Sequence, residues 1–227
     1  MTDILSLLVK HHRNGDEFAR LMQETADKRF DDGFWSLWEQ WIEPVLKEHP
    51  KIADLGCGPG VLLKKLRARY PTAMLTGVEY APYMLKALDN SENKVVIHDL
   101  HQTDLSIPDN SQDVMTFIHS LHELIYPTRA LQSAHRCLKK GGRCLIIDWV
   151  RMPLKDYLAG SAHMYTEEDI FSDKITHTEL HDVFHHFTEH NRYSVEDIDW
   201  LLEKVGFTTL EKTEYHSKQF ALWVVEK

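Results

Sequence analysis

Apolar residues between positions 50 and 150 follow two alternating patterns. Short apolar runs predict strands at 51–56, 73–80, 94–100, 113–120 and 143–150, because each has strand length and ends in polar or turn-forming residues. Amphipathic stretches at 61–70, 82–89 and 127–140 predict the intervening helices, and Gly141 and Gly142 are expected to close the last one. Strands that alternate with helices predict right-handed crossovers and a mostly parallel sheet.

The two ends of the chain follow other patterns. Residues 16–48 predict helix, with Trp35 and Trp38 at helical spacing and Pro44 ending or kinking the run. Residues 151–198 show no clear strand. A helix is predicted to end at Gly206, and 208–215 and 220–227 predict two strands whose short link permits only an antiparallel hairpin.

These elements predict one α/β domain, a doubly wound Rossmann-like, mostly parallel sheet with a C-terminal antiparallel hairpin. Four parts are expected. They are an N-terminal helical lid (1–49), a cofactor-binding core (50–150), a helical insertion that caps the substrate (151–198) and the terminal helix with the hairpin (199–227). The tryptophans Trp35, Trp38 and Trp41 could cover a site as a lid, although ordinary helix packing is the favoured interpretation.

Composition narrows the class of protein. The 227 residues carry a formal net charge of −9, which argues against a protein whose main task is binding nucleic acid phosphates. Three cysteines form neither a paired framework nor a CxxC metal motif. The N-terminus lacks the pattern of a signal peptide, and no run approaches the length of a membrane span. A cytoplasmic protein is therefore expected, with no nucleic acid or membrane partner and an undetermined oligomeric state.

The segment IADLGCGPG (52–60) joins the first predicted strand to its helix. Strand, glycine turn and helix occur in the order that binds nucleotides in doubly wound sheets, and Glu79 follows Gly60 by 19 positions, where a carboxylate can bind ribose hydroxyls. A tight turn without a ligand is the plain alternative. A dinucleotide site is disfavoured, because Val61 replaces the third glycine of GxGxxG.

Four segments together resemble the class I S-adenosylmethionine-dependent methyltransferases. ADLGCGPG resembles their first motif and GVEYAPYMLKAL their acidic second-strand motif. LSIPDNSQDVMTFIHSLHEL and HRCLKKGGRCLIID are similar to the segments around their fourth and fifth strands. The resemblance covers roughly residues 50–150 and implies S-adenosylmethionine as the cofactor.

The resemblance also implies roles for single residues. Gly56, Gly58 and Gly60 would line the methionine part of the cofactor. Asp54 would receive its ammonium group and Glu79 its ribose hydroxyls. The adenine would be flanked by Tyr80 and met at its edge by Asp99 and the backbone of Leu100.

Two histidines are the catalytic candidates. His122 falls just beyond the fourth strand, where ligands bind in such sheets, and its ordinary pKa suits a general base. A structural, loop-capping histidine is an equally weighted alternative. His119 could belong to the core or to the pocket, and it ranks below His122 because the strand interior mostly packs.

Acceptor recognition is expected in the termini and in 151–198. The substrate candidates are His163, Tyr165, His181 and His185, with Arg29 and Phe30 as further contacts. Two histidines four apart could share a metal, but no third ligand is defined, so no metal site is predicted. The leading hypothesis is methyl transfer to a small molecule. A methyltransferase acting on transfer RNA or protein and a non-catalytic binding module are the alternatives.

Overall fold

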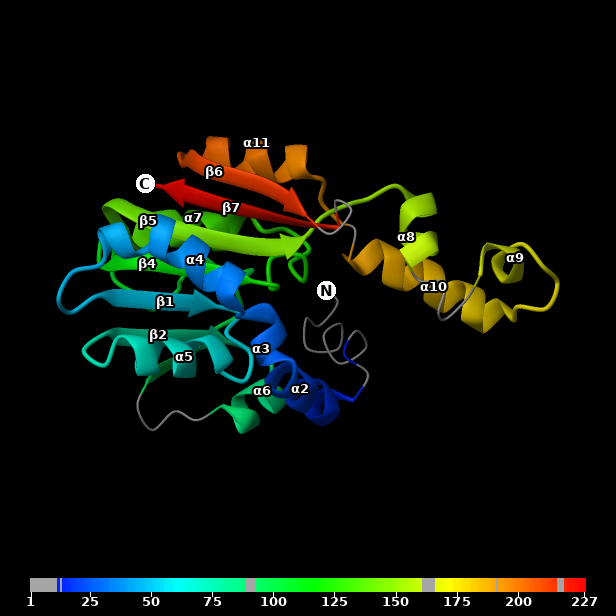
Figure 1. Ribbon diagram of the computed structural model, residues 1–227, viewed down its shortest axis with the longest axis horizontal. Helices are drawn as coiled ribbons and strands as arrows, with labels where there is room; N and C mark the ends of the chain where they lie inside the picture. Colours follow the sequence, from blue (N-terminus) through cyan, green and yellow to red (C-terminus); the bar gives the residue numbers. More distant parts are fainter. Residues whose placement is uncertain (1–11, 13, 89–92, 161–165, 191, 216–218) are drawn as a thin grey trace.

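The computed structural model describes residues 12, 14–88, 93–160, 166–190, 192–215 and 219–227 of the 227-residue chain. Within them the sheet has seven strands in the order β3-β2-β1-β4-β5-β7-β6 (Figure 1). The strands are β1 (Lys51–Leu55), β2 (Met74–Glu79), β3 (Lys94–Ile97), β4 (Gln112–Ile118), β5 (Leu138–Trp149), β6 (Thr208–Tyr215) and β7 (Phe220–Glu226). Strands β1 to β5 are parallel, and β7 runs antiparallel to both of its neighbours. The predicted fold class is confirmed.

The expected end of the helix after β4 is wrong. Helix α7 (Thr128–Cys137) ends three residues before the position predicted, and Gly141 and Gly142 lie inside β5. Gly141 has a φ of +75° and donates its N–H to the carbonyl of Lys227, while Lys227 donates to the carbonyl of Gly142. The two glycines therefore shape the irregular start of a strand and do not cap a helix.

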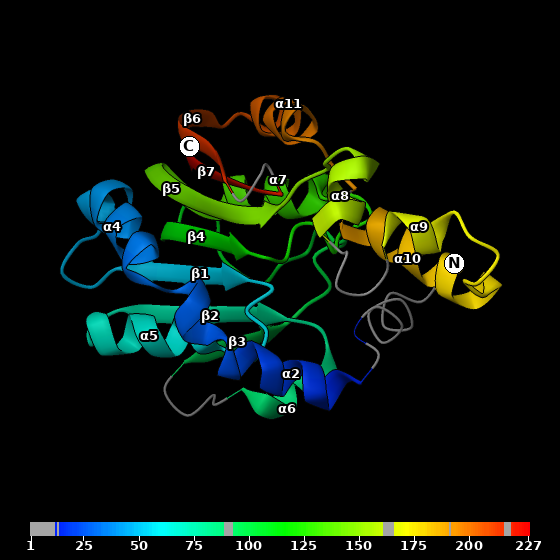
Figure 2. The ribbon, with the colours of Figure 1, turned by 45° about the vertical axis from the view of Figure 1, so that its right-hand side comes forward.

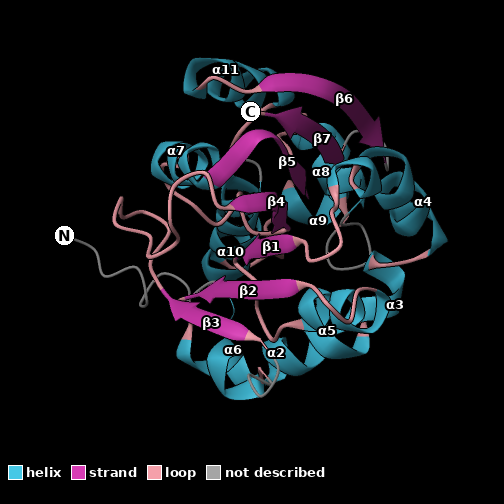
Figure 3. Cartoon of the chain, turned by 90° about the vertical axis from the view of Figure 1, so that its left-hand side faces the viewer, coloured by secondary structure: helices cyan, strands magenta, loops and turns pink. Residues whose placement is uncertain are grey.

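Helices cover both faces of the sheet (Figure 3). One apolar layer contains residues of α7 and α11 (Val195–Val205), and the other contains residues of α4 (Asp32–Trp41) and α5 (Val61–Arg69). Helix α11 begins with a capping box between Ser194 and Asp197 and ends at Gly206 in the left-handed region, as its sequence predicts. This sandwich leaves the carboxyl ends of the parallel strands as one shared edge.

The N-terminal helical run is interrupted. It forms α2 (Gly15–Glu24), α3 (Ala26–Arg29), α4 and the short 3-10 turn η1 (Glu43–Val45). Asp31 starts α4 by accepting the N–H of Phe34, which explains the break between α3 and α4. Trp38 is fully buried in the apolar layer with α5 and donates to the Tyr70 hydroxyl. Packing therefore accounts for Trp38.

Three helices lie beside the sheet, within residues 154–160 and 167–190. Helices α8 (Leu154–Gly160), α9 (Glu167–Ile170) and α10 (His177–His190) extend away from the strands in two views (Figures 1 and 2). They have a small apolar cluster of their own, built around Met152, Tyr157 and Val183. No helix in the described part of the chain is both long enough and apolar enough to span a bilayer.

Candidate functional site

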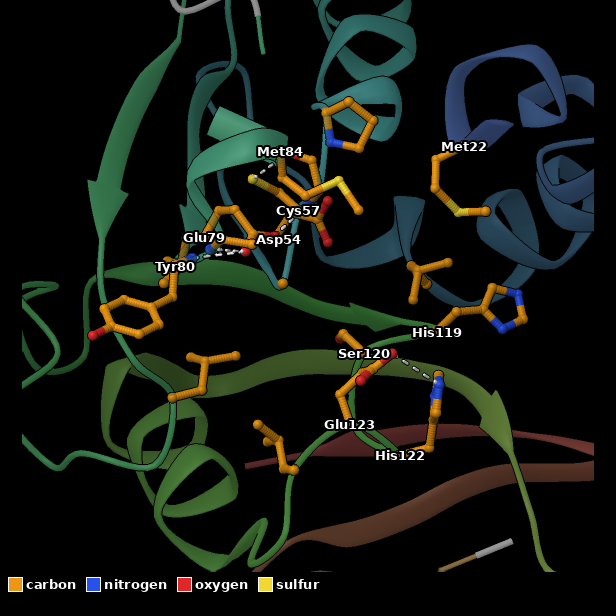
Figure 4. A pocket seen from close by; sticks show the side chains of 18 of the residues that line it. Met22, Asp54, Cys57, Glu79, Tyr80, Met84, His119, Ser120, His122 and Glu123 are labelled. Atoms are coloured by element: carbon orange, nitrogen blue, oxygen red, sulfur yellow. Dashed lines mark hydrogen bonds and ion pairs between the residues drawn. The ribbon is translucent and has the colours of Figure 1, made fainter. Parts of the chain in front are cut away.

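A cavity of about 460 Å³ lies at the carboxyl edge of the parallel strands. The turns after β1, β2, β3 and β4 supply much of its wall (Figure 4). Residues of α2, α3, α5, α6 (Pro82–Ala87), α10, β5 and β7 also line it. In doubly wound sheets this edge is where ligands bind, because the strand order changes direction there. The volume falls in the range of ~300–1,000 Å³ that is usual for small-molecule sites.

The glycine turn after β1 forms one wall. The φ angles of Gly56, Gly58 and Gly60 are +73°, +53° and +75°. Residues with a Cβ atom rarely adopt such positive φ angles. A Cβ atom on Gly56 would lie 2.5 Å from the Cβ of Ser120, so the β1 and β4 loops can meet only with glycine at this position. Gly60 does not line the cavity and instead starts α5. Gly56 and Gly58 therefore bring the backbone to the cavity surface.

Glu79, at the end of β2, holds two turns together. Its Oε1 accepts the N–H groups of Tyr80 and Ala81 at 2.7 and 2.8 Å. Its Oε2 accepts the N–H of Gly58, 21 residues earlier, at 2.9 Å. Strand pairing alone brings β1 beside β2, and this carboxylate then fixes the glycine turn against the end of β2.

Asp54 is almost completely buried at the end of β1. Its Oδ1 accepts the hydroxyl of Thr116 on β4 at 2.6 Å. Burial raises the pKa of Asp54 to about 7, although the Thr116 hydrogen bond lowers it, and the nearby Glu79 charge raises it further. A cation in the cavity would therefore favour the ionised form of Asp54 over the protonated one.

Asp99 follows β3 and binds its own loop. Its Oδ1 accepts the backbone N–H of His101 at 3.0 Å and lies 2.7 Å from Nδ1 of the same residue. Burial raises the pKa of Asp99, but these hydrogen bonds outweigh burial, and the net pKa is lowered. Asp99 is therefore ionised at neutral pH, and both it and Leu100 line the cavity.

His122 is held by two carboxylates. Its Nδ1 lies 2.5 Å from Oδ1 of Asp148, and its Nε2 lies 3.4 Å from Oε1 of Glu123. Burial alone would lower the pKa of His122, but Asp148 and then Glu123 outweigh it and raise the pKa to about 10. An imidazolium that donates from both nitrogens has no lone pair for a substrate proton. The geometry therefore favours the orienting or structural role over the base role.

Asp148, on β5, also organises the loop that carries His122. Its Oδ2 accepts the successive N–H groups of Ser120, Leu121 and His122 at 3.1, 2.5 and 3.2 Å. Ser120 in turn donates its hydroxyl to the carbonyl of Leu55 at 2.7 Å. The buried carboxylate of Asp148 thus holds the backbone of the loop after β4 and stabilises the protonated form of His122.

His119 faces the cavity from the residue after β4. Its φ of +54° is uncommon for a side chain, and such strained positions cluster at functional sites. Burial lowers the pKa of His119 to about 4, Asp148 raises it, and the charges of His122 and Arg29 lower it further. Its buried Nδ1 has no hydrogen-bond partner in the described structure. His119 is therefore neutral, and its ring packs edge-on against Phe220.

The acceptor candidates from the sequence are only partly brought together. His181 and His185 stack on each other along α10 but do not line the cavity, whereas the neighbouring His186 does. His186 Nδ1 lies 2.6 Å from the hydroxyl of Tyr157. His163 and Tyr165 lie outside the described residues. Arg29 and Phe30 both line the cavity.

His12 is a cavity residue that the sequence pattern does not identify. Its Nδ1 lies 2.5 Å from the Tyr83 hydroxyl and its Nε2 lies 3.2 Å from Oε1 of Glu123. Its ring stacks on Phe18 with centroids 4.0 Å apart. These partners are up to 111 residues away, so no local spacing could have indicated the contact.

No group of three or more potential metal ligands occurs among the described residues. We therefore expect exhaustive treatment with EDTA to leave the affinity for S-adenosylhomocysteine, measured by calorimetry, within about twofold of the untreated value. The reason is that a binding site without ligands for a metal loses nothing when metals are removed. Loss of binding that returns on adding one divalent ion would contradict this prediction, and dialysis without EDTA is the control.

Residues 11–212 match the sequence profile of the methyltransferase domain family. A demethylmenaquinone methyltransferase of Chlamydia trachomatis is 26% identical over 121 residues, which cover 52% of this chain and 53% of the relative. The chain therefore matches about half the length of this curated relative.

Solved structures share the fold. A complex between the Trm112 methyltransferase activator and a methyltransferase of Haloferax volcanii contains a chain with a TM-score of 0.66 and 16% identity, covering 94% of this chain and 97% of that one. An S-adenosylmethionine-dependent methyltransferase of Aquifex aeolicus gives a TM-score of 0.62 and 18% identity, covering 92% and 97%. With the profile match over most of its length, the chain belongs to the class I S-adenosylmethionine-dependent methyltransferases.

Proposed function

We propose that the protein binds S-adenosylmethionine in this cavity and transfers its methyl group to a small-molecule acceptor. The observation that carries the proposal is the juxtaposition of the backbone of Gly56 and Gly58 with Asp54, Glu79 and Asp99 at one edge of the sheet. The cofactor contains a sulfonium and an ammonium group, so a cavity lined by carboxylates matches its charge.

The residues present fit the cofactor. Asp54 is the carboxylate suited to the ammonium group, because ligand charge would repay the burial that raises its pKa to about 7. Glu79 is suited to the ribose hydroxyls. It already accepts three N–H groups, yet an ionised carboxylate has about four acceptor sites, which leaves room for a hydroxyl. Tyr80, Asp99 and Leu100 would surround the adenine.

Methyl transfer requires little acid–base chemistry from the protein. The cofactor supplies an already activated methyl carbon, so the chain contributes binding, orientation and exclusion of water. His122 contributes by holding the loop after β4 in place through Asp148. His119 contributes a neutral imidazole to the cavity wall, where Trp149 and Phe220 are also found.

A small-molecule acceptor is supported by the cavity volume of about 460 Å³ and by the net charge of −9, which opposes binding to nucleic acid. A demethylmenaquinone methyltransferase among the relatives also bears the name of a small-molecule acceptor. The second candidate is a macromolecular acceptor. The likeness to a methyltransferase bound to the Trm112 activator supports only a protein partner for this chain.

We expect S-adenosylhomocysteine at about 100 times its dissociation constant to stabilise the fold by about 2.7 kcal/mol. For a domain of this size the melting temperature should rise by roughly 5–10 °C, measured by differential scanning fluorimetry. NAD at the same concentration is the control and should give no rise, because Val61 and the acidic cavity do not suit a pyrophosphate. A rise in melting temperature with NAD and none with S-adenosylhomocysteine would contradict the cofactor assignment.

The acceptor can then be identified with labelled cofactor. The pure protein is incubated with methyl-labelled S-adenosylmethionine and either a metabolite extract or the macromolecular fraction of a lysate. Label in a small molecule supports the proposal. Label found only in RNA or protein would establish the second candidate instead.

A further inference from the structure

A guanidinium lines the cavity together with several carboxylates and the buried imidazolium of His122. Arg29, the last residue of α3, is the only Arg or Lys among the described residues that line it. Asp54, Glu79 and Asp99 line the same cavity. The wall therefore presents both signs of charge, as a zwitterionic ligand requires.

The guanidinium of Arg29 is held in place by neutral groups. Its Nη1 donates to the Thr25 hydroxyl at 2.7 Å, and its Nη2 donates to the carbonyl of Met22. Both partners lie at the end of α2, and Thr25 is itself anchored to the carbonyl of Leu21 at 2.6 Å. The side chain is therefore oriented before any ligand arrives.

No carboxylate of the described chain neutralises Arg29. None lies within ion-pair distance, although nine other Arg and Lys side chains of the described residues form such pairs. Two N–H groups of the guanidinium are used, whereas an arginine has five. Burial lowers the pKa of Arg29, and a partly buried charge without a counterion is costly. The positive charge of Arg29 also acts on His119 and lowers the pKa of its imidazole.

From this juxtaposition we propose that Arg29 is the carboxylate-binding residue of the cavity. The planar guanidinium fork matches a carboxylate with two parallel hydrogen bonds, and charge-assisted bonds of this kind are the strong ones. The inference rests on the proposed function, which provides two sources of a carboxylate: the methionine part of the cofactor and the acceptor.

A pair of ligands tests the first source. S-adenosylhomocysteine and S-adenosyl-3-thiopropylamine differ only in the carboxylate, and both are titrated calorimetrically into wild type, Arg29→Gln and Arg29→Lys. Arg29→Gln should lower the affinity for S-adenosylhomocysteine by about 10- to 100-fold and change that for the amine by less than threefold. Arg29→Lys should restore part of the loss. Arg20→Gln, on the exposed face of α2, is the matched control and should change neither affinity.

A second arm tests the acceptor as the source. Benzoate and succinate are observed by ligand-detected NMR on protein saturated with S-adenosylhomocysteine. Unchanged cofactor affinity in Arg29→Gln together with loss of their binding would support the proposal and assign the carboxylate to the acceptor.

Three results separate this inference from the proposed function. Wild-type protein that binds no S-adenosylhomocysteine overturns the proposed function and the inference with it. Wild-type binding that survives in Arg29→Gln, with no effect on benzoate or succinate, overturns only the inference. Equal losses for both adenosyl ligands in Arg29→Gln also overturn it, because they show that Arg29 merely stabilises the end of α2.

Discussion

Asp148→Ala is expected to destabilise the protein by about 3–5 kcal/mol at neutral pH, because it removes the nearer of the two carboxylates that pair with the buried imidazolium of His122. It also removes the acceptor of three successive N–H groups in the loop after β4. The change is measured by urea denaturation. His122→Gln in the same chain removes the stranded charge, so the double variant should recover part of the stability lost in Asp148→Ala.

The same pair predicts how stability depends on pH. Asp148 and Glu123 raise the pKa of His122 to about 10, above the value of roughly 6.5 expected in the unfolded chain. A raised histidine pKa gives stability that is complete below pH ~6.5 and is lost as the pH rises through 10. Wild type should therefore lose stability between pH 7 and 10, and His122→Gln should lose less. The prediction fails if the free energy of unfolding changes with pH equally in wild type and His122→Gln and if Asp148→Ala is as stable as wild type. Those results would show that His122 and Asp148 do not form a charged pair.

Glu79→Ala is expected to weaken binding of S-adenosylhomocysteine by about 1.5–3 kcal/mol, or roughly 10- to 150-fold, because a charged acceptor of the ribose hydroxyls is removed. The variant also frees the N–H of Gly58, so the glycine turn loses its link to the end of β2. Calorimetry with S-adenosylhomocysteine measures the effect. The fold should survive, since the side chain is only partly buried.

Two further variants sharpen this prediction. Glu79→Gln keeps one oxygen acceptor but no charge, so its loss should be smaller than that of Glu79→Ala. Asp104→Ala removes an exposed carboxylate of the loop after β3 that does not line the cavity, and it should bind as wild type does. A folded Glu79→Ala protein with unchanged affinity would assign the ribose hydroxyls to another residue.

The strands and the glycine turn could be predicted because their causes are local. The apolar runs at 51–56 and 73–80 have the length and turn chemistry of strands, and the three closely spaced glycines mark a turn that needs positive φ angles. The carboxyl ends of parallel strands share one edge, so Asp54, Glu79 and Asp99 could be expected to lie together once the strand order was recognised. The end of α7 was predicted wrongly, because a glycine at positive φ serves a strand irregularity as well as a helix cap.

The roles of the histidines could not be predicted, since they depend on partners far away in the sequence. Nothing in SLHEL indicates that Asp148, 26 residues later, holds His122 as an imidazolium. The helical pattern of 177–190 was visible, but which of its flanks meets the cavity depends on how α10 sits against the sheet, and His186 lines it where His181 and His185 do not.

The sequence by itself determined the fold class, the glycine turn and the acidic edge of the cavity, because periodicity and backbone chemistry act over a few residues at a time. Only the tertiary structure decided the charge of His122, the neutrality of His119 and the isolation of Arg29 in the cavity wall. Protonation and charge pairing depend on burial and on groups brought within a few ångströms by folding, and residue order alone carries neither.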